Sequence, residues 1–85
     1  MANQLPILSK TILATKGIEV AEYTDEIRPA FNRMDVGQVY GFKHVKDSSL
    51  RAVKSMFEKD SFYEKKWSVI GMDPIEKVIY VKRVS

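Results

Sequence analysis

The sequence predicts a single α+β domain in which a small antiparallel sheet carries one main helix on one face, in the order β-β-β-α-β-β. Short segments rich in β-branched and aromatic residues alternate with turn residues, and apolar residues recur at helical spacing mainly over residues 50–57. A chain of 85 residues has room for one core, and no linker rich in Pro, Gly or Ser divides it. Residues 1–85 are therefore expected to fold as one domain.

The first two strands are expected to form a β-hairpin. β-Branched residues are frequent in residues 7–15 and again in residues 18–23, and Gly17 lies between the two segments. Glycine readily adopts the positive φ that tight hairpin turns require. The polar residues that follow end at Pro29, which restricts the residue before it to extended geometry. A connection, or at most a short helical turn, is predicted over residues 24–29.

Three further strands are expected. One is predicted over residues 38–44, where Gly41 marks a bulge or a close approach of another backbone. Two more are predicted over residues 67–72 and 77–84, because both segments are rich in residues that favour strands. Residues 73–76 between them have turn chemistry, so the last two strands are expected to form a second hairpin.

The main helix is predicted over residues 48–60. Its apolar positions are three or four residues apart, at Leu50, Val53, Met56 and Phe57. A cluster of residues suited to capping a helix N-terminus precedes them, namely Asp47, Ser48 and Ser49. This pattern indicates an amphipathic helix that buries one face against the sheet and leaves a polar face outside.

Positive charge is concentrated in the second half of the chain. Residues 1–42 carry four basic and five acidic side chains, whereas residues 43–85 carry ten basic and six acidic ones. Such an asymmetry favours a polyanionic partner, because neutralising phosphates releases condensed counterions. Cations that merely solvate the surface and protect strand edges are the alternative. The candidate nucleic-acid-binding residues lie on the helix, before the strand at 67 and in the last strand: Arg51, Lys54, Lys65, Lys66, Lys82 and Arg83.

The sequence contains no pattern typical of catalysis or cofactor binding. It has no cysteine, its one histidine (His44) lies between lysines, its glycines are too dispersed for a phosphate-binding loop, and its carboxylates are scattered. We therefore expect no enzymatic activity, no cofactor and no metal. The chain also lacks a secretory signal and any apolar run of the roughly 18–20 residues that would span a bilayer. We expect a cytoplasmic protein without a membrane partner.

Several aromatic residues lie on predicted strands, where exposed rings can stack nucleic-acid bases. Tyr40-Gly41-Phe42 is similar to the aromatic-small-aromatic centre of the RNA-recognition motif, but residues 1–37 offer no helix between two strands as that fold requires. A domain this small needs its large side chains inside. Four rings are therefore expected in the core: Tyr40, Phe42, Trp67 and Tyr80.

Residues 34–84 resemble small accessory proteins encoded by bacteriophages. The shared motifs are a Val-Gly turn before a strand, a Ser-x-Arg helix start, a lysine pair before a strand and a closing strand that ends in Arg-Val, here MDVGQV (34–39), SSLRAVKS (48–55), KKWSV (65–69) and VKRV (81–84). This chain has Lys82 where those proteins carry an aromatic residue. The resemblance implies a viral origin and action in the cytoplasm of the host cell.

Two functions are consistent with these observations. The first is a non-enzymatic phage-type accessory protein that binds nucleic acid through the six cations. The alternative is a phage-encoded inhibitor that binds and blocks a host protein of the defence or transcription machinery, by a strand edge, a helix face or an apolar patch. Self-association into a homo-oligomer through the same surfaces is a third possibility.

Overall fold

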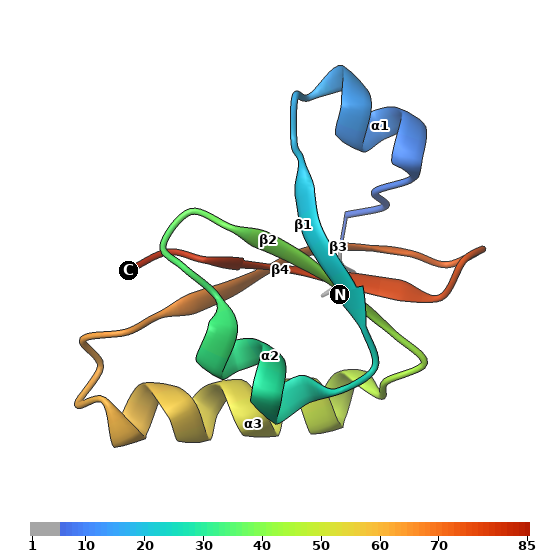
Figure 1. The fold of residues 1–85 in the computed structure, drawn as a ribbon. Helices are drawn as coiled ribbons and strands as arrows, with labels where there is room; N and C mark the ends of the chain where they lie inside the picture. Colours follow the sequence, from blue (N-terminus) through green and yellow to red (C-terminus); the bar gives the residue numbers. More distant parts are fainter. Residues whose placement is uncertain (1–5) are drawn as a thin grey trace.

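A four-stranded mixed sheet forms the centre of the computed structural model, which describes residues 6–85 (Figure 1). In the order β1-β2-β4-β3 across the sheet, the strands are β1 (Val20–Thr24), β2 (Val39–Lys43), β4 (Val78–Arg83) and β3 (Trp67–Asp73). β1 runs parallel to β2, while β4 lies antiparallel to both β2 and β3. The predicted α+β class is confirmed, but the sheet is mixed rather than antiparallel.

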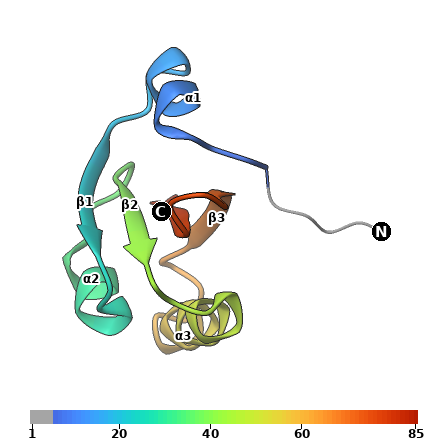
Figure 2. The ribbon, with the colours of Figure 1, turned by 90° about the vertical axis from the view of Figure 1, so that its right-hand side faces the viewer.

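In residues 6–85, three helices pack on the two faces of the sheet: α1 (Lys10–Thr15), α2 (Ile27–Arg33) and α3 (Asp47–Asp60). Parallel neighbours need a crossover, and α2 supplies the one from β1 to β2. Figure 2 shows α2 and α3 side by side on one side of the sheet and α1 on the other. We call these sides the α3 face and the α1 face. Within residues 6–85, no helix is long and apolar enough to cross a membrane.

The predicted first hairpin is wrong, because residues 10–15 form helix α1. Ser9 caps its N-terminus, where Ser9 Oγ accepts a hydrogen bond from the Ile12 backbone N–H at 3.2 Å. Gly17 does adopt a positive φ of 71°, but it ends the helix. The N–H groups of Gly17 and Ile18 donate to the carbonyls of Ala14 and Leu13, which is the Schellman pattern.

The seven-residue helix α2 begins inside the segment 24–29 that was predicted as a connection or a short helical turn, and it extends beyond that segment to Arg33. Pro29 is the third residue of this helix, where its missing N–H costs nothing because the first turn has no intrahelical partners for these groups. α2 buries Ala30 and Phe31, and Arg33 near its end forms an ion pair with Glu22 on β1. The element order is thus α-β-α-β-α-β-β, not the predicted β-β-β-α-β-β.

Helix α3 confirms the predicted main helix and begins one residue earlier, at Asp47. Its N-cap is Lys46, whose side chain makes no capping hydrogen bond, so none of the three predicted N-cap candidates, Asp47, Ser48 and Ser49, is the N-cap. Asp47 instead places a carboxylate in the first turn, where it interacts favourably with the helix dipole.

The second hairpin forms as predicted, with β3 and β4 paired in antiparallel register. Asp73 is buried at its turn, and one carboxylate oxygen accepts the N–H groups of Ile75 at 3.0 Å and Glu76 at 3.1 Å. Gly41 in β2 marks a close approach, but of a side chain. A Cβ at this position would lie 2.6 Å from the Tyr23 ring.

Each face of the sheet has its own apolar cluster. On the α3 face, Phe31 stacks on Trp67 with ring centroids 5.0 Å apart, and it meets Phe42 and Phe57 edge-on. On the α1 face, the buried residues are Leu8, Leu13, Val39, Val78 and Tyr80. The four strand aromatics expected in the core, Tyr40, Phe42, Trp67 and Tyr80, are all buried, so none of them presents a ring to a base.

The packing around Gly71 gives a first prediction. A Cβ at this position would lie 2.6 Å from Leu8 side-chain atoms and 2.7 Å from the Pro6 carbonyl oxygen. Gly71→Ala must therefore push the 6–8 segment away from β3, and we expect it to lower the free energy of unfolding by about 1–3 kcal/mol. Urea denaturation measures the loss. Ser68→Ala, on an exposed position of the same strand, is the control, and a similar effect of both substitutions would contradict the prediction.

Tyr80 gives a second prediction. Burial raises the pKa of Tyr80 above its ordinary value, and the Tyr23 hydroxyl 3.5 Å away contributes to the shift. The folded state holds this proton more tightly than the unfolded chain, so stability is intact below pH about 10 and falls as the pH rises further. Between about pH 8 and about pH 11, ionisation of Tyr80 in the unfolded chain should cost about 1.4 kcal/mol. Tyr80→Phe should lose less stability over that range in chemical denaturation, and an equal loss would refute this origin.

Candidate nucleic-acid interface

The structure separates the six predicted cations into two groups. Arg51 and Lys54 lie on α3, and each is paired with an acidic residue one helical turn away. Arg51 Nε lies 2.9 Å from the Asp47 carboxylate, and Lys54 Nζ lies 3.2 Å from the Glu58 carboxylate. These two pairs are neutral units on the helix surface, so Arg51 and Lys54 offer little net positive charge to a polyanion.

The other four cations meet at the end of the β3–β4 pair that is opposite the hairpin turn. Register places Arg83 beside Trp67 and Lys82 beside Ser68. The pairing continues past β3, because the Lys66 N–H donates to the Ser85 carbonyl at 3.1 Å and the Lys66 carbonyl accepts from Val84 at 2.7 Å. Antiparallel pairing therefore brings together four cations that we call the basic end: Lys65, Lys66, Lys82 and Arg83.

Arg83 has a structural role within the basic end. One of its terminal nitrogens donates to the Met34 carbonyl at 2.6 Å, and its Nε donates to the Ser85 carbonyl at 3.0 Å. Its guanidinium carbon lies 5.7 Å from the centre of the Trp67 ring, within cation–π range. Arg83 thus ties the last strand to the end of α2. The lysines of the basic end, in contrast, are exposed.

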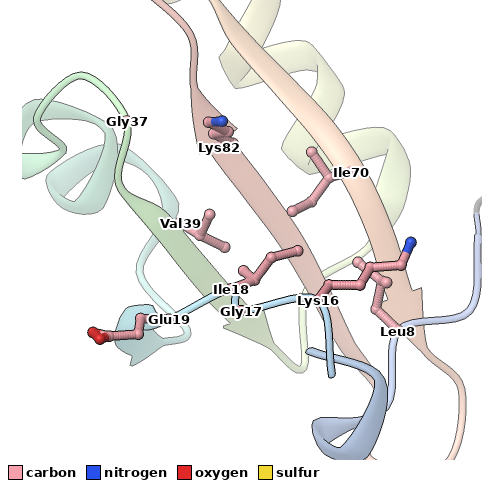
Figure 3. Close-up of a pocket in the computed structure, with 9 residues that line it drawn as sticks. All are labelled: Leu8, Lys16, Gly17, Ile18, Glu19, Gly37, Val39, Ile70 and Lys82. Atoms are coloured by element: carbon pink, nitrogen blue, oxygen red, sulfur yellow. The ribbon is translucent and has the colours of Figure 1, made fainter. Parts of the chain in front are cut away.

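Lys82 also borders a hollow on the α1 face. This pocket has a volume of about 530 Å³ and is lined in part by Val39, Ile18 and Ile70. Figure 3 shows these apolar side chains between Lys82 and Lys16. Sequence reasoning missed Lys16, because it belongs to the half of the chain with net negative charge and only the α1–β1 connection brings it over the sheet.

Two exposed aromatic residues lie next to the basic end. Phe62 and Tyr63 have relative exposures of 88% and 56%. Both adopt left-handed backbone conformations, with φ of 54° and 62°, which cost roughly 1–2 kcal/mol per residue. The N–H groups of Phe62 and Tyr63 donate to the carbonyls of Lys59 and Glu58, at 2.9 Å and 2.8 Å. Hydrogen bonds therefore hold these residues in the strained turn that follows α3.

Phe62 and Tyr63 were not among the aromatic residues that the sequence suggested for base stacking. A signal was present: two adjacent aromatics lie between the end of a helix and a lysine pair, outside any alternating strand pattern. The aromatics that were considered as base-stacking candidates lie on strands and are buried.

Residues suited to catalysis do not gather at the basic end. His44 is exposed directly after β2, away from the lysine pair in the chain. Among residues 6–85, no group of three or more His, Cys, Asp or Glu side chains is placed to hold a metal ion. What the geometry of the basic end offers is a surface of lysines and exposed rings.

Comparisons with protein-family models, with curated proteins and with solved structures find no match for this chain. Inference about its function therefore depends on the geometry of its own residues.

The separate roles of Arg83 and Lys82 give a third prediction. Arg83→Lys removes the guanidinium group, whose nitrogens donate hydrogen bonds to the Met34 and Ser85 carbonyls. We therefore expect a loss of about 1.5–3 kcal/mol in the free energy of unfolding. Lys82→Gln, at the neighbouring exposed position, should stay within about 0.5 kcal/mol of the parent chain. Urea denaturation of both variants measures this. Equal stability of the two variants would show that Arg83 has no structural role.

Proposed function

We propose that this domain is a non-enzymatic accessory protein of the bacteriophage type that binds nucleic acid through the basic end. The observation that carries this proposal is that strand pairing makes Lys66 and Lys82 neighbours, while Lys65 and the exposed rings of Phe62 and Tyr63 come just before Lys66 in the chain. Cations interleaved with exposed rings suit a ligand that has a phosphate backbone and flat bases. The resemblance of residues 34–84 to small phage accessory proteins supports the proposed origin.

The three lysines are available to phosphates. They are exposed, and the ion pairs found among the described residues do not include them. Strand pairing places Lys66 next to Val84 and Ser68 next to Lys82, so Lys66 and Lys82 are diagonal neighbours, about 7–8 Å apart at their Cα atoms in such a ladder. Neighbouring positive charges of this kind favour the release of counterions from a polyanion.

Binding to a host protein is the second candidate function, and the unpaired outer edge of β1 supports it. In the described residues β1 pairs only with β2, so its outer edge presents unpaired backbone groups to which a partner's strand can add. A pull-down from nuclease-treated host lysate distinguishes the two functions. A stoichiometric protein partner that survives nuclease treatment supports the inhibitor, whereas loss of the bound material supports nucleic-acid binding.

A matched pair of double variants tests the basic end. Lys65→Gln with Lys66→Gln and Arg51→Gln with Lys54→Gln each remove two positive charges. Only the first pair removes cations without an ionic partner. We expect the first to weaken binding of a fluorescent single-stranded oligonucleotide and to reduce the slope of log affinity against log salt by about 1.4. The second should change the slope little. Fluorescence anisotropy over a salt series measures both.

Two results would contradict the proposed function. One is the absence of binding by the parent chain at low ionic strength, where counterion release is most favourable. The other is an equal effect of the two double variants, which would indicate a response to net charge alone. Circular dichroism of each variant confirms that the fold is retained.

A further inference from the structure

The turn that exposes Phe62 also forms the wall of a groove. The groove has a volume of about 540 Å³ and lies where α2, the end of α3 and the 61–65 turn come together. The residues that line it include Phe62 and four polar residues, Asn32, Asp60, Glu64 and Lys65. An exposed aromatic ring, hydrogen-bonding groups and an ammonium group therefore share one concave surface.

The charges of this groove indicate how a nucleic acid would lie. The carboxylates of Asp60 and Glu64 repel phosphates, so they disfavour a phosphate backbone inside the groove. Lys65 lines the groove and is followed in the chain by Lys66. A backbone that follows these lysines would direct its bases, rather than its phosphates, toward Phe62.

The chemistry of the lining fits a base that is neither paired nor stacked. Aromatic side chains stack on bases whose faces are free, and carboxylates and amides hydrogen-bond to their Watson–Crick edges. In a duplex these faces and edges are already occupied. A carboxylate accepts hydrogen bonds from an exocyclic amino group, such as cytosine N4. Thymine and uracil instead present two carbonyl oxygens on either side of one N–H, and these oxygens would face the carboxylates unfavourably.

We propose that this groove holds one unpaired nucleobase, stacked on Phe62 and read by Asp60, Glu64 and Asn32, so that bases with an exocyclic amino group bind better than thymine or uracil. This inference rests on the proposed function and names its ligand class, single-stranded nucleic acid. The left-handed backbone at Phe62 then has a purpose, because it belongs to the turn that leaves this ring exposed after α3.

Binding of oligo(dC), oligo(dT) and a duplex of the same length, followed by fluorescence anisotropy, tests the inference. The parent chain should prefer oligo(dC) to both. Phe62→Ala should weaken oligo(dC) binding about tenfold and leave duplex binding unchanged, while Phe62→Tyr should retain binding. Ile75→Ala is the matched control, since Ile75 is 87% exposed at the hairpin turn, away from the groove, and should have no effect.

The carboxylates have their own test. Asp60→Asn with Glu64→Gln removes two negative charges and so should tighten binding of every oligonucleotide, but it should abolish the preference for oligo(dC) over oligo(dT). The ratio of the two affinities is the readout. Equal binding of oligo(dC) and oligo(dT) by the parent chain would refute the proposal that Asp60 and Glu64 select a base with an exocyclic amino group.

The outcomes separate this inference from the proposed function. If Phe62→Ala leaves oligo(dC) binding intact while the Lys65 and Lys66 double variant weakens it, the base site is refuted and binding through the basic end is supported. If the parent chain binds none of the three probes at low salt, both are refuted.

Discussion

The stack of Phe31 on Trp67 is the contact on which the rest of the structure depends. Phe31 is the buried residue of α2 that meets Phe42 of β2 and Phe57 of α3, while Trp67 is the first residue of β3. One pair of rings with centroids 5.0 Å apart thus connects α2 and, through Phe57, α3 to the sheet. In a domain of this size, where burial of large side chains supplies most of the stability, few other contacts connect so many elements.

The same stack fixes the basic end. Trp67 is held in place by its backbone N–H, which donates to the Glu58 carboxylate at 3.0 Å, and by Arg83, whose guanidinium lies over its ring. Glu58 is in turn paired with Lys54 on the same helix. Lys54 and Arg83, which the sequence suggested for ligand binding, therefore help to hold Trp67 in place. Lys66 and Lys82 are the chain neighbours of Trp67 and Arg83, so this arrangement also positions them.

Features that depend on neighbours in sequence were predictable. The β3–β4 hairpin followed from its turn chemistry, and its pairing explains why most of the predicted cations meet. Features that depend on distant partners were not. The β-branched residues of 10–15 favour a strand by themselves, and this segment is helical because the Ser9 cap, the turn at Gly17 and the burial of Leu13 together outweigh that preference. The role of Arg83 depends on the carbonyl of Met34, which is 49 positions away in the chain. Phe62 is exposed because no other part of residues 6–85 packs over it, and this depends on the tertiary structure.

The short segment before α1 has a consequence for the growth of the sheet. Ile7 bridges Met72 in parallel register, and backbone hydrogen bonds join Leu8 and Pro6 to Met72, so this segment covers the outer edge of β3 at Met72. The outer edge of β1 pairs with no other segment within the described residues. Addition of a second copy through β1 of both chains would use up both β1 edges, so pairing of this kind stops at two copies, and the bridge at Met72 hinders growth from the β3 side.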